Sequence, residues 1–141
     1  MIRAVRSLWE RVTEPRRLRA FYAVVYAVTL LIGFATLLSP PQSIAGELGP
    51  FVTTFWAVLL VLGGFGGLLT VLPGWWWAER LSIWLVFAGL GIYLLVVLSL
   101  HLSSRDGSSR LTQLGVIALA SGVFAVRLML TKGMDYEPRR R

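Results

Sequence analysis

Residues 48–78, LGPFVTTFWAVLLVLGGFGGLLTVLPGWWWA, contain no Asp, Glu, Lys or Arg. About 20 apolar residues in a helix cover the roughly 30 Å hydrocarbon layer of a bilayer, so this stretch is long enough to cross one. Three more uncharged windows follow the same pattern, at residues 20–46, 81–104 and 111–126. A soluble domain needs charge on all of its exposed faces, and this chain lacks it. The sequence therefore predicts an integral membrane protein.

The composition agrees with this prediction and excludes several kinds of chemistry. Hydrophobic residues make up 56% of the 141 residues and charged residues only 15%, against about 25% in an average soluble protein. There is no cysteine, which excludes disulfides and thiolate chemistry. The formal net charge of +7 comes from arginines that flank the apolar spans. We therefore expect anionic lipid headgroups, and not nucleic acid, as the partner of the basic residues.

The apolar windows predict the architecture. We expect transmembrane helices at residues 20–38, 51–72, 81–102 and 113–130. The alternating pattern of a membrane β-strand is missing, and an open sheet cannot satisfy its edge hydrogen bonds in lipid. The fold class is thus an all-α, integral membrane, antiparallel four-helix bundle over residues 15–132, followed by a basic tail at 133–141. We interpret the first span as a permanent anchor, because its apolar core is longer than the roughly 7 to 15 residues of a cleaved signal peptide. The alternative is a signal peptide with a small-residue cleavage site at Ile44, Ala45 and Gly46.

The basic residues predict the orientation. One side of the membrane receives the arginines of the leader, Arg80 and the basic tail, whereas the other receives only Arg105 and Arg110. Short loops rich in Lys and Arg stay in the cytoplasm. We therefore expect a multi-pass protein of the cytoplasmic membrane with both termini inside.

Residues 1–14 have the pattern of a helix that lies on the membrane surface. At 100° per residue, Ile2, Val5, Leu8, Trp9 and Val12 share one face. The basic residues of the segment and of the start of the first span would then contact lipid phosphates. They are Arg3, Arg6, Arg11, Arg16, Arg17 and Arg19. The alternative is a basic leader that only sets the topology.

The connections between spans are short. Residues 39–50 hold three prolines and two glycines, which predicts a rigid outer loop. Residues 73–80 form a shorter connection, which makes the second and third spans antiparallel neighbours. Residues 103–109, SSRDGSS, form a polar turn.

Catalysis inside a bilayer requires buried ionisable groups, and few candidates exist. All seven acids, Glu79 among them, are expected in loops or termini, so we predict no paired carboxylates, proton relay, metal site or cofactor site. His101, the one histidine, is interpreted as a polar residue at a helix end, with a pH-sensitive gate as the alternative. The sequence therefore predicts a protein that is not an enzyme.

Arg127 lies inside the apolar end of the fourth span. We interpret it as an interface anchor, because an arginine within one turn of the boundary reaches water along its own stem. The alternative is a pair with Glu79 or with a backbone carbonyl across the bundle.

Aromatic residues near the ends of the spans are interpreted as further anchors, because they prefer the headgroup layer. The alternative for the tryptophan run is a platform for a lipid or a protein partner. The predicted aromatic anchors are Trp9, Trp75, Trp76, Trp77 and Tyr136.

Small residues recur along the last three spans, which predicts close helix packing, because helices in lipid attract one another through close backbone approach. Two readings remain open: these residues close the bundle, or some of them mediate self-association. They are Gly63, Gly64, Gly66, Gly67, Gly89, Gly91, Gly115, Ala118 and Gly122.

Four segments carry a resemblance to known proteins: TEPRRLRAFY (13–22), SPPQSIAGELG (39–49), LPGWWWAERL (72–81) and KGMDYEPRRR (132–141). In these the chain resembles small four-span membrane proteins of actinobacteria and their phages. Some of those proteins lie near phage lysis genes and are regarded as holin-like, which the resemblance implies for this chain.

Two functions remain as hypotheses. The first is a self-associating, holin-like protein that permeabilises the membrane as a homo-oligomer. The second is a scaffold or accessory subunit that binds another membrane protein or lipid.

Overall fold

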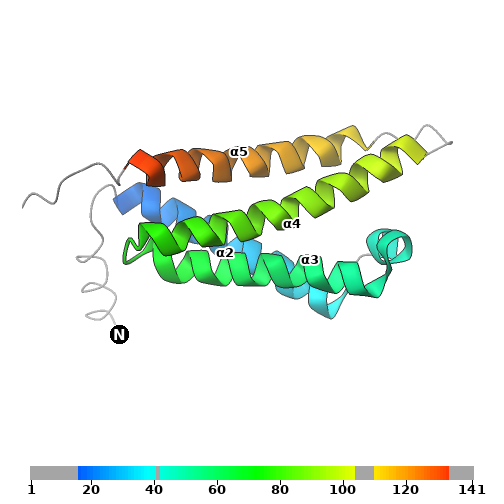
Figure 1. Cartoon of the computed structure of the whole chain (residues 1–141), viewed down its shortest axis with the longest axis horizontal. Coiled ribbons are helices and arrows are strands. Elements are labelled where there is room, and N and C mark those ends of the chain that lie inside the picture. Colours follow the sequence, from blue (N-terminus) through cyan, green and yellow to red (C-terminus); the bar gives the residue numbers. More distant parts are fainter. Residues whose placement is uncertain (1–15, 41, 104–109, 134–141) are drawn as a thin grey trace, which may run out of the picture.

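The computed structural model describes residues 16–40, 42–103 and 110–133, and in these ranges the chain is helical without strands. The four helices are α2 (Arg16–Leu38), α3 (Gln42–Val71), α4 (Trp76–Ser103) and α5 (Leu111–Gly133). They run up and down as an antiparallel bundle, and the start of α2 lies at the same end as the end of α5 (Figure 1). The predicted leader helix lies outside the described residues, with the predicted contact residues Arg3, Arg6, Trp9 and Arg11. The predicted anchor Tyr136, near the other end of the chain, also lies outside them.

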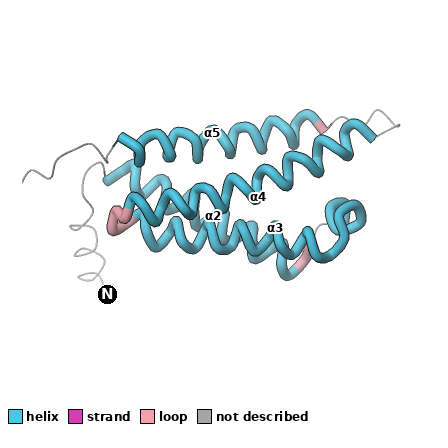
Figure 2. Tube along the Cα trace, viewed as in Figure 1, coloured by secondary structure: helices cyan, strands magenta, loops and turns pink. Residues whose placement is uncertain are grey.

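Each helix is long and apolar enough to cross a membrane. The four predicted spans are confirmed, and every helix begins before the predicted residue. Figure 2 shows how little non-helical chain separates α3 from α4. At this turn Gly74 has a φ of 78°, a conformation that glycine adopts without strain.

The outer loop predicted at residues 39–50 is wrong in part, because helix α3 already begins at Gln42. Its first turns are set at an angle to the rest, since Gly49 has φ 75° and ψ 166° and breaks the helical path. Pro50 then restarts the helix, a position where its missing N–H costs nothing. The glycines and prolines therefore produce a kink between two helical pieces and not an extended loop.

Close approach of the helices depends on glycine. A Cβ at Gly64 would lie 2.6 Å from the backbone nitrogen of Leu30 in α2, and one at Gly63 would lie 2.6 Å from Val86 in α4. Gly66 faces Ser82, and Gly89 faces Leu60. At Gly63, Gly64, Gly66, Gly67 and Gly89 a larger side chain would therefore meet a neighbouring helix. Gly33 of α2, which packs against Val61, was missed.

Three of the predicted packing glycines make no such contact. A Cβ at Gly91, Gly115 or Gly122 would meet nothing within 4 Å, so at these three positions the structure shows no close contact within the bundle that requires glycine. Two of them, together with Ala118, lie on the exposed side of α5.

Helix α5 is the least packed of the four. In its apolar window 22% of the residues are buried, against 39% in α3. It lies beside α4, on the opposite side from α3 (Figure 1). An apolar groove, hereafter the α2–α5 groove, separates it from α2. The groove is lined by Phe21, Tyr22, Gly115, Ala118, Leu119, Gly122, Val123 and Val126.

Several hydroxyl groups of the described spans are buried and bonded to the backbone of their own helix. The hydroxyls of Thr29, Thr36 and Thr70 donate to carbonyls four residues earlier at 2.7–2.9 Å. Large apolar side chains such as Leu31 and Leu95 are about two-thirds exposed. This inverted distribution suits a protein whose outer solvent is lipid.

We predict that Gly67→Ala destabilises the bundle by roughly 1–3 kcal/mol or more, because the added methyl group would overlap the ring of Tyr26. Gly91→Ala is the matched control: it has open space, and we expect no loss and a gain of up to about 1 kcal/mol from helix propensity. Reversible unfolding in mixed micelles measures both. Equal stability of the two variants would contradict the packing described above.

Candidate functional site

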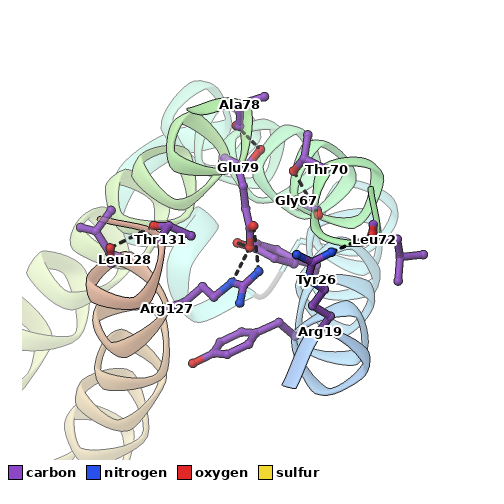
Figure 3. A network of polar contacts seen from close by, with 12 residues as sticks. Arg19, Tyr26, Gly67, Thr70, Leu72, Ala78, Glu79, Arg127, Leu128 and Thr131 are labelled. Carbon is purple, nitrogen blue, oxygen red and sulfur yellow. Dashed lines mark hydrogen bonds and ion pairs between the residues drawn. The ribbon is translucent and has the colours of Figure 1, made fainter. Parts of the chain in front are cut away.

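A carboxylate and a guanidinium meet inside the bundle. Glu79, in the first turn of α4, is 0% exposed, and Arg127, near the end of α5, is 2% exposed. Arg127 Nε lies 2.6 Å from Glu79 Oε1, and Nη2 lies 2.8 Å from Oε2 (Figure 3). This two-pronged geometry is the strongest form of an arginine–carboxylate pair.

Two predictions are corrected by this pair. Glu79 was expected in a loop, but α4 begins at Trp76 and carries Glu79 into the interior. Arg127 was expected to reach out toward water, but its side chain turns inward to the carboxylate. The alternative reading, a pair with Glu79 across the bundle, is the one that the structure shows. An acid in the first turn of a helix also has a favourable interaction with the helix dipole.

Aromatic residues of α2 complete the cluster. Tyr26, fully buried, donates from its hydroxyl to Glu79 Oε1 at 3.2 Å. The Cζ atom of Arg127 lies 4.8 Å from the ring centroid of Tyr22, at a distance typical of a cation–π contact. Tyr22 in turn donates to the carbonyl of Val123 at 3.1 Å. Helices α2, α4 and α5 are therefore joined through one carboxylate and its arginine.

A second arginine lies at the edge of the cluster. Arg19 is 3% exposed, its Cζ is 4.8 Å from the ring centroid of Trp76, and its Nη1 donates to the carbonyl of Leu72 at 3.4 Å. Arg80 Nη2 donates to the carbonyl of the buried Thr131 at 2.8 Å, which adds a second link between α4 and α5. We call this end of the bundle the basic end.

The predicted tryptophan run divides into two environments. Trp76 is partly buried under Arg19, whereas Trp75 and Trp77 are 60% and 76% exposed. Two exposed indole rings at a helix end are consistent with the predicted position in the headgroup layer. His101 is partly exposed near the opposite end of α4, far from the cluster.

Sequence reasoning missed the α2 side of the cluster. Arg19 was assigned to lipid contact, and neither Tyr22 nor Tyr26 was singled out. Their spacing of three and four residues does put them on one helical face, the same face that meets Glu79 and Arg127. A polar stripe on an otherwise apolar span was the signal that could have found them.

The arrangement joins helices α2, α4 and α5. The α2–α5 groove is lined by Tyr22, but neither Glu79 nor Arg127 reaches it. Among the residues that the structure describes, no three His, Cys, Asp or Glu side chains come together as metal ligands would. Comparison with family models, curated proteins and solved structures finds no match to the chain.

We predict that Glu79→Gln lowers the free energy of unfolding by about 3–5 kcal/mol, because it leaves the buried guanidinium of Arg127 without an opposite charge. Arg17→Gln is the control: it also removes one charge at the basic end, but from an exposed side chain, where we expect about 0.5 kcal/mol or less. Reversible unfolding in mixed micelles measures both losses. A similar, small loss in the two variants would refute the structural role of the pair.

Proposed function

We propose that the protein is a non-enzymatic, self-associating membrane protein that assembles through the exposed side of α5. The observation that carries the proposal is a set of small residues of α5 that are exposed in the part of the chain that the structure describes. Gly115, Ala118 and Gly122 are spaced by three and four residues, so they share one helical face, and both glycines have open space above them. We call this surface, with Leu119 and Val126 beside it, the α5 face.

The rest of the bundle supports this use of the α5 face. Glycines of α3 lie at close contacts with both of its neighbours: Gly64 meets Leu30 of α2, and Gly63 meets Val86 of α4. The α5 face has the same kind of residues and forms one wall of the open α2–α5 groove, whose other wall is Phe21 and Tyr22 of α2. Lipid gives little hydrophobic drive for association, so helices in a membrane attract one another through close van der Waals contact. A second helix that approaches the α5 face closely gains contacts that the bundle itself does not make there.

A second copy of the chain fits the α5 face. Copies inserted with the same topology present parallel α5 helices to each other, and a two-fold axis along the membrane normal would bring each α5 face onto itself. The face is uncharged, so this contact brings no like charges together. Since one contact buries only one side of α5, the four-helix bundle keeps its own structure in the assembly.

The absence of an enzymatic role is also part of the proposal. The one buried acid among the described residues is held by Arg127 on both oxygens and by Tyr26 on one of them. A carboxylate bonded in this way is not available to take a proton from a substrate.

Two roles follow for such an assembly, and the geometry favours a scaffold or accessory subunit. The described lateral surface is apolar, so bundles in contact remain surrounded by lipid. Holin-like permeabilisation is the second candidate, and the buried hydroxyls favour it. Thr29, Thr36, Thr53, Thr70 and Ser82 would line water if the helices of each bundle separated.

We predict that Gly122→Leu weakens self-association roughly tenfold or more, because its side chain holds the two α5 helices apart. Gly91→Leu is the matched control, since Gly91 also has open space but lies on α4. Energy transfer between labelled copies, diluted in vesicles, measures the association. A monomeric wild type, or equal association of both variants, would exclude assembly through the α5 face.

Expression of the same variants separates the two roles. A scaffold leaves the membrane potential intact at every expression level. Depolarisation by the wild type, together with release of a co-expressed endolysin and loss of both effects in Gly122→Leu, would establish the holin-like role instead.

A further inference from the structure

The charges buried at the basic end do not balance. Glu79 is the one buried acid in the described ranges, and two arginines, Arg19 and Arg127, are equally buried beside it. Both guanidinium groups lie near the same indole ring, at 4.8 and 5.9 Å from the centroid of Trp76. Arg127 binds both oxygens of the carboxylate, so two buried positive charges share one acid and Arg19 makes no hydrogen bond to it.

The unused edge of Arg19 has a specific geometry. Arg127 binds its carboxylate through Nε and Nη2. In Arg19 the Nε atom is buried and has no hydrogen-bond partner, and the one hydrogen bond of the group is the 3.4 Å contact from Nη1 to Leu72. The edge through which Arg127 donates to two oxygens therefore has no hydrogen-bond acceptor in Arg19. A buried guanidinium without an anion is costly, which makes an external anion the expected occupant.

The backbone around Arg19 suits an anion as well. The guanidinium rests against the turn at Gly74, where a Cβ would lie 3.0 Å from both Nη1 and Nη2. Directly after this turn the 28-residue helix α4 begins, at the residue whose ring Arg19 covers. The first N–H groups of a helix have no partner within it and carry a partial positive charge. Arginine and helix N-terminus therefore converge on one place.

We propose that Arg19 and the first turn of α4 form a binding site for a phosphate group, hereafter the Arg19 site. The planar fork of arginine matches two oxygens of a phosphate, and helix N–H groups supply further donors. The exposed rings of Trp75 and Trp77 flank the site, so a lipid headgroup at the membrane surface is one source of the phosphate. A free phosphate in solution has the same chemistry and is the other source. On binding, the edge of the guanidinium that carries Nε gains two charge-assisted hydrogen bonds, while Nη1 keeps its contact with Leu72.

The test uses the purified full-length protein in a non-ionic detergent and native mass spectrometry. The probes are phosphatidylglycerol, diacylglycerol with the same acyl chains but no phosphate, and inorganic phosphate. We expect one phosphatidylglycerol to bind roughly tenfold or more tightly than diacylglycerol, and Arg19→Gln to remove this preference. Arg17→Gln, which removes an exposed charge two residues away, should change the affinity by about twofold or less.

A second variant and a second probe complete the test. If Arg19→Gln does not fold, Arg19→Lys replaces it: this variant keeps the charge but not the fork, and we expect severalfold weaker binding of phosphatidylglycerol. Binding of inorganic phosphate that depends on Arg19 would support the site and identify a free anion as its ligand. Equal losses in the Arg17 and Arg19 variants, unchanged binding in Arg19→Lys, or no preference for either phosphate probe would overturn the proposal. None of these outcomes depends on self-association through the α5 face.

Discussion

A charged side chain buried in a membrane protein is costly unless an opposite charge lies beside it, and in this molecule Glu79 and Arg127 pair with each other. Removing one partner of such a buried pair costs several kcal/mol, because the other charge is then left in a medium that cannot solvate it. The two residues belong to different helices, so the pair cannot form until α4 and α5 stand side by side in the correct register. The rest of the basic end is arranged around this contact: two tyrosines of α2 contact the pair, and Trp76 lies beneath both arginines.

Close helix packing at glycines also stabilises the bundle, and these glycine contacts are unevenly distributed among the helices. Helices α2, α3 and α4 pack closely at glycines, whereas α5 packs through buried apolar residues such as Ile117 and Phe124 and is linked to α2 and α4 by polar contacts at the basic end. Helix α5 is therefore held to the bundle on one side and exposed along another face. This asymmetry underlies the proposed assembly through the α5 face. The Arg19 site arises from a different imbalance, that of two buried arginines and one buried acid.

Much of this fold could be predicted from the sequence, and the errors have physical causes. Windows without charge located the four spans, because the cost of burying a charge in lipid is large and local. The same rule failed at Glu79 and Arg127 because it considers each helix alone. A charged residue that pairs with an opposite charge on another helix can lie inside a span, so it does not mark the end of that span. The glycines of α3 were recognised as packing residues from their spacing, but spacing does not reveal whether a face meets a neighbour. For that reason Gly64 and Gly122 looked alike in the sequence and differ in the structure.

The account rests on the coupling between Glu79 and Arg127, and a double-mutant cycle measures it most directly. The cycle compares the unfolding free energies of Glu79→Gln, Arg127→Gln and the double variant with that of the wild type in one lipid mixture. Each single variant leaves one buried charge at positions 79 and 127 without its partner, whereas the double variant has two neutral amides there. The account therefore predicts that the double variant is more stable than either single variant. Losses that simply add would show that the two residues act independently, and the pair would then not be what holds the bundle together.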